Sequence, residues 1–215
     1  MNDEDIDKQI VDQLYWDNSV SVADVAVTVE DGWVTLEGTV PSYHAKVTAT
    51  DDAYQVLGVK FVDNKLRVAY KDTHSDNGIE ADIVSALDWD FDLDAQDIAV
   101  SVNEGEVKLL GTVDAYWKKF IAEQDVAKVR GVRSIRNEIA IVPTGEWSDE
   151  QIAKAVEEAM RRNVNVDVND VDITVDDGEV TLTGVVSDWQ ERYAADSSAL
   201  YTTGVRAVDN ELQIG

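Results

Sequence analysis

Few residues in this chain have the types and spacing that catalysis or metal binding requires. The sequence contains no cysteine and only two histidines, His44 and His74, which stand in different sequence contexts. The lack of thiols excludes disulfides, thiol catalysis and cysteine-based metal sites. Two unrelated histidines do not make a catalytic triad or a metal site. No Gly-rich phosphate-binding motif of the G-x-x-x-x-G-K-[ST] or G-x-G-x-x-G type occurs. We therefore expect a non-enzymatic protein that holds no cofactor and no metal.

Acidic side chains are abundant, and one run of them resembles a calcium loop. Residues 88–94 read D-W-D-F-D-L-D, which places aspartates at positions 1, 3 and 5 of such a loop. However, Leu93 stands where the sharp-turn glycine belongs, and Ala99 replaces the bidentate glutamate. The run favours a solvated acidic loop, with an ion site as the alternative interpretation.

Basic residues gather in one window of the chain. Residues 117–137 hold six cations and two carboxylates, whereas the whole chain has a net charge of −26. The candidate contact residues of this window are Trp117, Lys118, Lys119, Arg130, Arg133 and Arg136. One interpretation is an internal electrostatic match to acidic neighbours. The other is a site for a phosphate, a phospholipid headgroup or an acidic protein partner.

The overall charge limits the choice of partners. With 44 acidic and 18 basic residues, the chain repels nucleic acid and anionic lipid at long range, so we expect no nucleic-acid partner. Such an acidic surface also suits a high-salt cytoplasm, where screening weakens self-repulsion. No window approaches the roughly 18 apolar residues of a membrane-spanning helix. Residues 1–5 are acidic where a secretory signal is basic, which favours a cytoplasmic protein unless a signal was removed before Met1.

The chain contains an internal repeat with an offset of 73 residues and no gaps. Each copy contains the pattern V-x-L-x-G-x-V, beginning at Val34, Val107 and Val180. The glycines that recur in all copies are Gly32, Gly38, Gly58, Gly105, Gly111, Gly131, Gly178, Gly184 and Gly204. Turns, a helix cap and close packing account for glycine at these positions. A repeat of this length predicts three tandem domains, at residues 1–72, 73–145 and 146–215.

The pattern inside each copy predicts the order α-β-β-α-β. Apolar residues at every fourth position, such as Ile6, Ile10 and Leu14, predict a first helix with one buried stripe. Two alternating strands follow, joined by an Asp-Gly or Glu-Gly hairpin turn. A second helix is expected over residues 42–57, 115–130 and 188–203, ending at a C-cap glycine before the last strand. The expected linkers lie near 69–74 and 142–147. Predicted helix caps are Asn2, Ser75 and Ser148, the last in a capping box with Gln151.

Aromatic residues recur near the helix ends. Trp16 and Trp89 occupy equivalent ends of the first helix, and we expect them in a domain core or a contact between domains. An exposed binding patch is the alternative. Within the second helix, Val47, Phe120 and Tyr193 are expected to face the core, with Ala49, Ala122 and Ala195 nearby.

The repeated motifs resemble the BON domain family, named for bacterial osmotically inducible and nodulation proteins. The strongest likeness lies in D-G-W-V-T-L-E-G-T-V at 31–40, in the closure from Gly58-Val59 to Asn64, and in the helix ending W-D-N-S-V at 16–20. It looks like the leaderless members with three copies. The resemblance implies a three-stranded mixed sheet backed by two helices, no catalytic residues, and a role in osmotic or envelope stress, with phospholipid contact proposed for some exported members. We expect a stress-associated binding or scaffolding protein; the alternative is a cytoplasmic sensor of a small ligand or ion.

Overall fold

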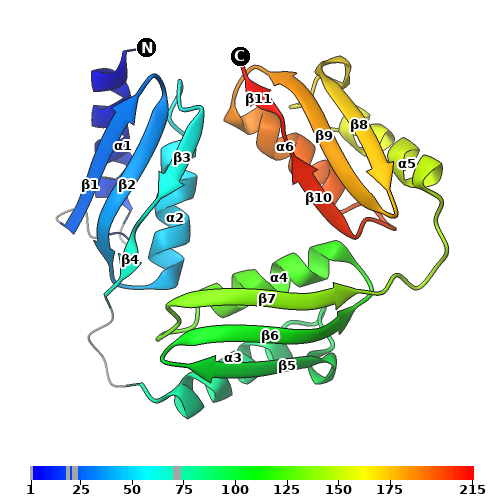
Figure 1. Ribbon diagram of the computed structural model, residues 1–215, viewed down its shortest axis with the longest axis horizontal. Helices are drawn as coiled ribbons and strands as arrows, with labels where there is room; N and C mark the ends of the chain where they lie inside the picture. Colours follow the sequence, from blue (N-terminus) through cyan, green and yellow to red (C-terminus); the bar gives the residue numbers. More distant parts are fainter. Residues whose placement is uncertain (1, 18–19, 21–23, 70–73) are drawn as a thin grey trace. The chain divides into compact units, whose positions relative to one another are not determined.

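The computed structural model describes residues 2–17, 20, 24–69 and 74–215, and we describe each domain by itself (Figure 1). The first domain contains α1 (Asp3–Trp16), β1 (Val25–Glu30), β2 (Trp33–Val40), α2 (Tyr43–Tyr54), β3 (Phe61–Asn64) and β4 (Arg67–Val68). The expected linker at 69–74 falls mostly outside the described residues, as do residues 18 and 19 of the W-D-N-S-V motif.

The other two domains repeat this order. The second contains α3 (Asp76–Trp89), η2 (Ala95–Asp97), β5 (Ile98–Asn103), β6 (Glu106–Val113), α4 (Tyr116–Ala127) and β7 (Ser134–Ile141). The third contains α5 (Asp149–Arg162), η3 (Val168–Asp170), β8 (Val171–Asp176), β9 (Glu179–Val186), α6 (Trp189–Leu200), β10 (Ala207–Asn210) and β11 (Gln213–Ile214). Each domain has its own sheet, so the prediction of three tandem α-β-β-α-β units is confirmed.

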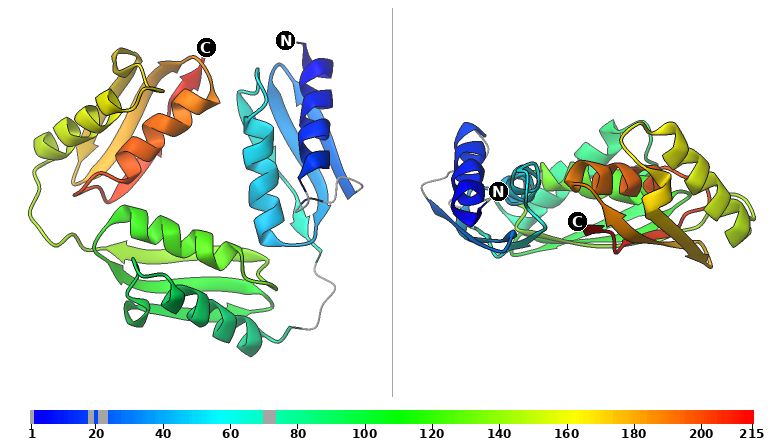
Figure 2. Two further views of the ribbon diagram at one scale, coloured as in Figure 1. Left: turned by 180° about the vertical axis from the view of Figure 1, so that it is seen from behind. Right: turned by 90° about the horizontal axis from the view of Figure 1, so that it is seen from above.

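Each sheet is mixed, with the second strand of the hairpin in the centre. In the first domain β1 pairs antiparallel with β2 through the hairpin, and β3 pairs parallel with β2 on the other side. The third domain repeats this arrangement around β9. Both helices of a domain cover the same face of its sheet, which leaves the opposite face open (Figure 2). A strand with one covered face alternates buried and exposed side chains. β2 follows this pattern, with Val34 and Leu36 among its buried residues.

The first helix of each domain forms where its sequence pattern predicts. Asn2, Ser75 and Ser148 accept hydrogen bonds from backbone N–H groups in the first turn, and Ser148 with Gln151 forms the expected capping box. These bonds satisfy donors that a helix start otherwise leaves unpaired. The apolar stripe is buried in all three helices, as in Ile83 and Val156, which are fully covered.

The same helix also holds the hairpin turn. Asp3, the first residue of α1, accepts hydrogen bonds from the backbone N–H groups of Asp31 and Gly32, at 2.9 and 3.2 Å. Asp76 and Asp149 do the same in the other domains. A charged acceptor shortens and strengthens such bonds. The repeat therefore carries an acid at this position because it joins the helix start to the turn.

The last strand differs from the expectation of one continuous strand. In the first and third domains it is interrupted, which gives β3 and β4, and β10 and β11. The break follows Asn64, whose side-chain oxygen accepts a hydrogen bond from the Leu66 N–H at 3.0 Å. The side-chain amide of Asn64 donates to the Lys46 carbonyl and the Thr50 hydroxyl of α2, both at 2.7 Å. Asn210 repeats these roles in the third domain, so the recurring asparagine ties the last strand to the second helix.

The inward face of the second helix is made of small residues. Ala49, Ala122 and Ala195 are fully buried, whereas Phe120 and Tyr193 are 39% and 57% exposed. The prediction that these two aromatic residues face the core is therefore wrong. Alanine lets the helix backbone approach the sheet closely, and a large ring does not fit at that separation.

The charge of the chain leads to a prediction about salt. We expect the thermal midpoint to rise by several degrees as KCl increases from about 0.01 M to about 1 M, because the Debye length then falls from about 30 Å to about 3 Å. Screening weakens repulsion among the 44 carboxylates more than it weakens the few exposed ion pairs. Calorimetry at constant pH measures this midpoint. A midpoint that falls steadily across this range contradicts the expectation of salt adaptation.

Candidate functional site

The basic residues of the second domain fall into two groups. Lys118 and Lys119 lie in the first turn of α4, and the helix rises by about 14 Å before it ends at Ala127. Lys118 is half-buried and forms an ion pair with Asp114 at 2.7 Å. Its ammonium also lies 5.6 Å from the centre of the Trp117 ring, within the range of a cation–π contact. Lys118 is thus held in place by its contacts with Asp114 and Trp117.

The three arginines form the second group, beyond the end of α4. All are exposed. Arg133 lies beside the hairpin, where its backbone N–H donates to the Gly105 carbonyl at 2.9 Å. Arg136 lies on β7 among the residues of the open sheet face, near Glu138. Glu138 bonds Lys108 at 2.8 Å, and that hydrogen bond lowers the pKa of its carboxyl. The arginine group therefore extends from the helix end to the open sheet face.

The last residues of the first helices and the turns that follow them present apolar side chains to solvent. Trp16 is 80% exposed and Trp89 is 83% exposed. In the same turn of the second domain Phe91 is fully exposed, and Val164 is 96% exposed at the equivalent position of the third. The expectation of a core position for Trp16 and Trp89 is therefore wrong. A group of exposed apolar side chains, such as Trp89 and Phe91, can mark a contact surface.

Two buried carboxyls have perturbed acidity, and their surroundings differ. Burial and, to a smaller extent, the nearby Asp17 carboxylate raise the pKa of Asp52 on α2 to about 6. The Asp52 Oδ2 atom has no hydrogen-bond partner among the described residues. Burial alone would raise the pKa of Glu191 as well, but hydrogen bonds from Ser187 and from the Asp167 N–H lower it. Glu191 thus anchors the start of α6, whereas Asp52 is only partly satisfied.

The acidic run at 88–94 serves local structure in the second domain. Asp90 follows the end of α3 and accepts a hydrogen bond from the Asp92 N–H at 2.8 Å. Asp94 accepts from the Gln96 N–H at the start of η2. Within the described part of the chain, no three His, Asp or Glu side chains are grouped as metal ligands.

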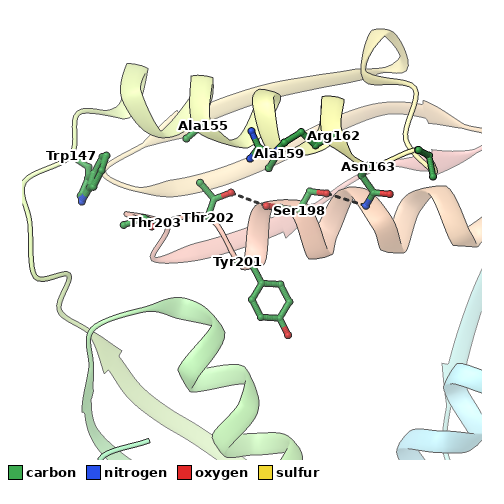
Figure 3. A pocket seen from close by; sticks show the side chains of 10 residues that line it. Trp147, Ala155, Ala159, Arg162, Asn163, Ser198, Tyr201, Thr202 and Thr203 are labelled. Carbon is green, nitrogen blue, oxygen red and sulfur yellow. Dashed lines mark hydrogen bonds between the residues drawn. The ribbon is translucent and has the colours of Figure 1, made fainter. Parts of the chain in front are cut away.

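A groove of about 700 Å³ lies between α5 and α6 of the third domain (Figure 3). Ala155 and Ala159 line it from α5, one helical turn apart. Ser198 lines it from α6, and Thr202 lines it from the turn that follows α6, four residues later. Their hydroxyls donate to helix carbonyls four residues earlier, both at 2.7 Å, so both hydroxyl protons already have an acceptor. The groove is therefore shaped by small side chains.

The ends of the groove carry larger groups. Trp147 lines one end and packs on Gly204, since a Cβ added to that glycine would lie 3.0 Å from the indole. Arg162 and Asn163 lie toward the other end (Figure 3), and Val164 also belongs to the lining. Arg162 is exposed and forms no ion pair or hydrogen bond with any described residue, whereas its neighbour Arg161 pairs with Glu157 at 2.6 Å. Arg162 is also the one charged residue in the lining.

The residues at the positions that line this groove differ in the other two copies. The first domain has Gln9, Gln13 and Asp52 where the third has Ala155, Ala159 and Ser198. The second domain has Asp82, Ala86 and Asp125 at these positions. We expect the longer side chains at these positions to take up more of the volume that alanine and serine leave open. The sequence analysis did not predict this groove, although the residue differences that form it can be seen when the three copies are aligned at the offset of 73 residues.

Taken together, the chain is built from three small α/β modules whose surfaces differ while their cores repeat. The BON domain family matches residues 2–70, 75–143 and 148–215, and the chain therefore belongs to this family. It is 30% identical to osmotically-inducible protein Y of Escherichia coli (strain K12) over 145 residues, which cover 65% of this chain and 72% of that protein.

Solved structures of CdsD, a structural protein of the type III secretion system of Chlamydia trachomatis, also align with the chain. One is 17% identical and covers 97% of this chain and 91% of its own, with a TM-score of 0.26. Another, of the C-terminal domain, is 16% identical and covers 99% and 98%, also with a TM-score of 0.26. In the described part of the chain, every helix is too short or too polar to cross a bilayer.

Proposed function

We propose that this chain is a non-enzymatic, stress-associated protein that binds or scaffolds through its BON modules, with phospholipid headgroups or a protein as partner. The likeness to an osmotically inducible protein supports the association with stress. The cytoplasmic setting expected from the sequence is part of this proposal.

The observation that carries the proposal is the exposure of Trp16, Trp89 and Phe91 in equivalent turns of two modules. Tryptophan prefers the headgroup level of a bilayer, where its ring is covered and its N–H stays hydrated. Such rings also anchor protein interfaces. The exposed arginines Arg130 and Arg133 are a second contact surface in this proposal, since each cation near an anionic surface contributes on the order of 1 kcal/mol.

Vesicle sedimentation tests the two surfaces, because they respond to salt in opposite ways. We expect the full chain to bind vesicles of phosphatidylglycerol and phosphatidylcholine weakly at low salt, since its charge of −26 is repelled. At about 0.5 M KCl, where repulsion is screened, binding through the aromatic turns should increase several-fold. Binding through the arginines should instead decrease.

The variants assign the contact. Trp16→Ala with Trp89→Ala should abolish the salt-induced binding, and Arg130→Glu with Arg133→Glu should reduce binding at low salt. Trp33→Ala is the matched control, because Trp33 is 58% exposed but lies against Phe61 on the open face of the first sheet. If the aromatic double variant sediments like the wild type at both salt concentrations, the turns are not the contact surface.

A specific observation favours a second candidate function. The groove of the third domain has the volume of a small-molecule site, which lies between about 300 and 1,000 Å³. This supports the alternative expectation of a ligand-responsive module.

A further inference from the structure

We propose that the groove between α5 and α6 of the third domain binds a small amphipathic anion, that is, an apolar or aromatic body with one carboxylate, sulfonate or phosphate group. This inference is independent of the aromatic turns of the first two domains. It rests on the shape of the groove, on the chemistry of its walls and on the single charge at its end.

The walls favour an apolar body. The methyl groups of Ala155 and Ala159 face the hydroxyl-bearing side of α6. Because the hydroxyls of Ser198 and Thr202 already donate to carbonyls of their own helix, they require no hydrogen bond from a ligand. Trp147 at one end of the groove offers a ring, 46% exposed, on which an apolar group can stack.

The charge at the other end favours an anion. Arg162 lines the groove without a partner among the described residues, and the lining contains no carboxylate. A lining with one arginine and no carboxylate is unusual in a chain with 44 acidic and 18 basic residues. A guanidinium can bind a carboxylate or phosphate through two parallel hydrogen bonds. Arg161 performs the ordinary role of a basic residue in the last turn of a helix, through its pair with Glu157, which leaves Arg162 available.

The comparison between modules makes the site specific to the third. Trp16 and Trp89 replace Arg162 in the other copies, and both lack the pair of alanines on the first helix. The first and second domains therefore lack both the cation and the pair of alanines at these positions. The second domain supplies a matched control position at Ala86, which is equivalent to Ala159.

Phenylbutyrate and its neutral analogue 4-phenylbutanol are suitable probes, because they differ in the anionic group alone. In NMR titrations of the full chain, phenylbutyrate should cause saturable shifts at residues 155–164 and 198–203, with a dissociation constant of about 1 mM or lower. Phenylbutanol should bind at least fivefold more weakly. Arg162→Glu and Ala159→Phe should each weaken phenylbutyrate binding at least tenfold, while Arg161→Glu and Ala86→Phe should leave it within twofold.

Each other result overturns the proposal. The proposal is wrong if phenylbutyrate gives no saturable shifts up to about 20 mM. It is also wrong if phenylbutanol binds as tightly as phenylbutyrate, or if the Arg162→Glu variant binds phenylbutyrate like the wild type. The spectra of the variants without probe show whether the third domain is folded. The vesicle assay separates the sources of the anion: Arg162→Glu and Ala159→Phe should leave sedimentation unchanged for a free anion, whereas a loss of sedimentation would show that the groove binds a lipid headgroup instead.

Discussion

Replacing Gly184 with alanine is expected to destabilise the third domain by about 2–4 kcal/mol. Gly184 lies within β9 at φ +135°, a backbone conformation that residues other than glycine rarely adopt. A Cβ at this position would lie 2.1 Å from the Asp170 carbonyl oxygen. Because this oxygen belongs to the backbone, it cannot move away without disturbing the start of β8.

Calorimetry and hydrogen exchange measure this effect. For a domain of this size, each 1 kcal/mol lowers the thermal midpoint by about 4–8 °C, so the transition of the third domain should fall by about 8 °C or more. If the domain fails to fold, amides in residues 148–215 should lose protection while those in the first domain keep it. Gly78→Ala is the matched control, since Gly78 lies in α3 and an added Cβ would meet only the Ser75 hydroxyl at 3.4 Å. That variant should be neutral or slightly stabilising; equal losses at both glycines would refute the steric explanation.

The fold can be predicted well from the sequence because the same residue pattern occurs three times. A glycine, an apolar position or a cap that recurs at a fixed offset reflects a requirement of the fold, as Gly38, Gly111 and Gly184 show with φ of 124°, 139° and 135°. The recurring Asp3 and Asn64 were visible in the same way, but their bonds to a distant turn and helix depend on tertiary contacts that the pattern does not encode.

The candidate sites are harder to predict because they depend on what differs between the copies. Phe120 and Tyr193 look like core residues by hydrophobicity, yet the close approach of the second helix to the sheet leaves room only for alanine. The groove likewise arises from Ala155 and Ala159, two unremarkable residues. Their role becomes visible only when α5 and α6 are known to pack side by side.

The partly satisfied carboxyl of Asp52 predicts a stability that depends on pH. Its pKa in the folded protein is about 6, against an ordinary value of 3.8, chiefly because it is buried between α1 and α2. The Asp17 and Asp51 carboxylates raise its pKa further, while a hydrogen bond with Gln13 opposes the rise. Since the folded state binds this proton more tightly than the unfolded chain, its stabilising effect is complete below pH 3.8 and is lost as the pH rises through about 6.

Asp52→Asn should therefore stabilise the first domain at pH 7.5 and have little effect near pH 4. A pKa difference of about two units corresponds to at most about 3 kcal/mol, and we expect a gain of about 1–2 kcal/mol because side chains relax around a buried charge. The third domain has uncharged residues at the positions equivalent to Asp17 and Asp52. There the Asn163 amide donates to the Ser198 hydroxyl at 3.4 Å. The double variant Asp17→Asn with Asp52→Ser transfers this pair to the first domain and should also remove the pH dependence.

The second domain supplies the control for this prediction. Asp125 is equivalent to Asp52, but its carboxylate forms an ion pair with Lys128 at 3.0 Å. Because a neighbouring cation stabilises the charged form, Asp125→Asn should bring no gain at pH 7.5. Thermal unfolding of the wild type and the variants across pH 4–8 tests the argument, with the titration of the Asp52 carboxyl carbon followed by NMR. A gain from Asp52→Asn that is equally large at both ends of this range would show that the buried charge is not its cause.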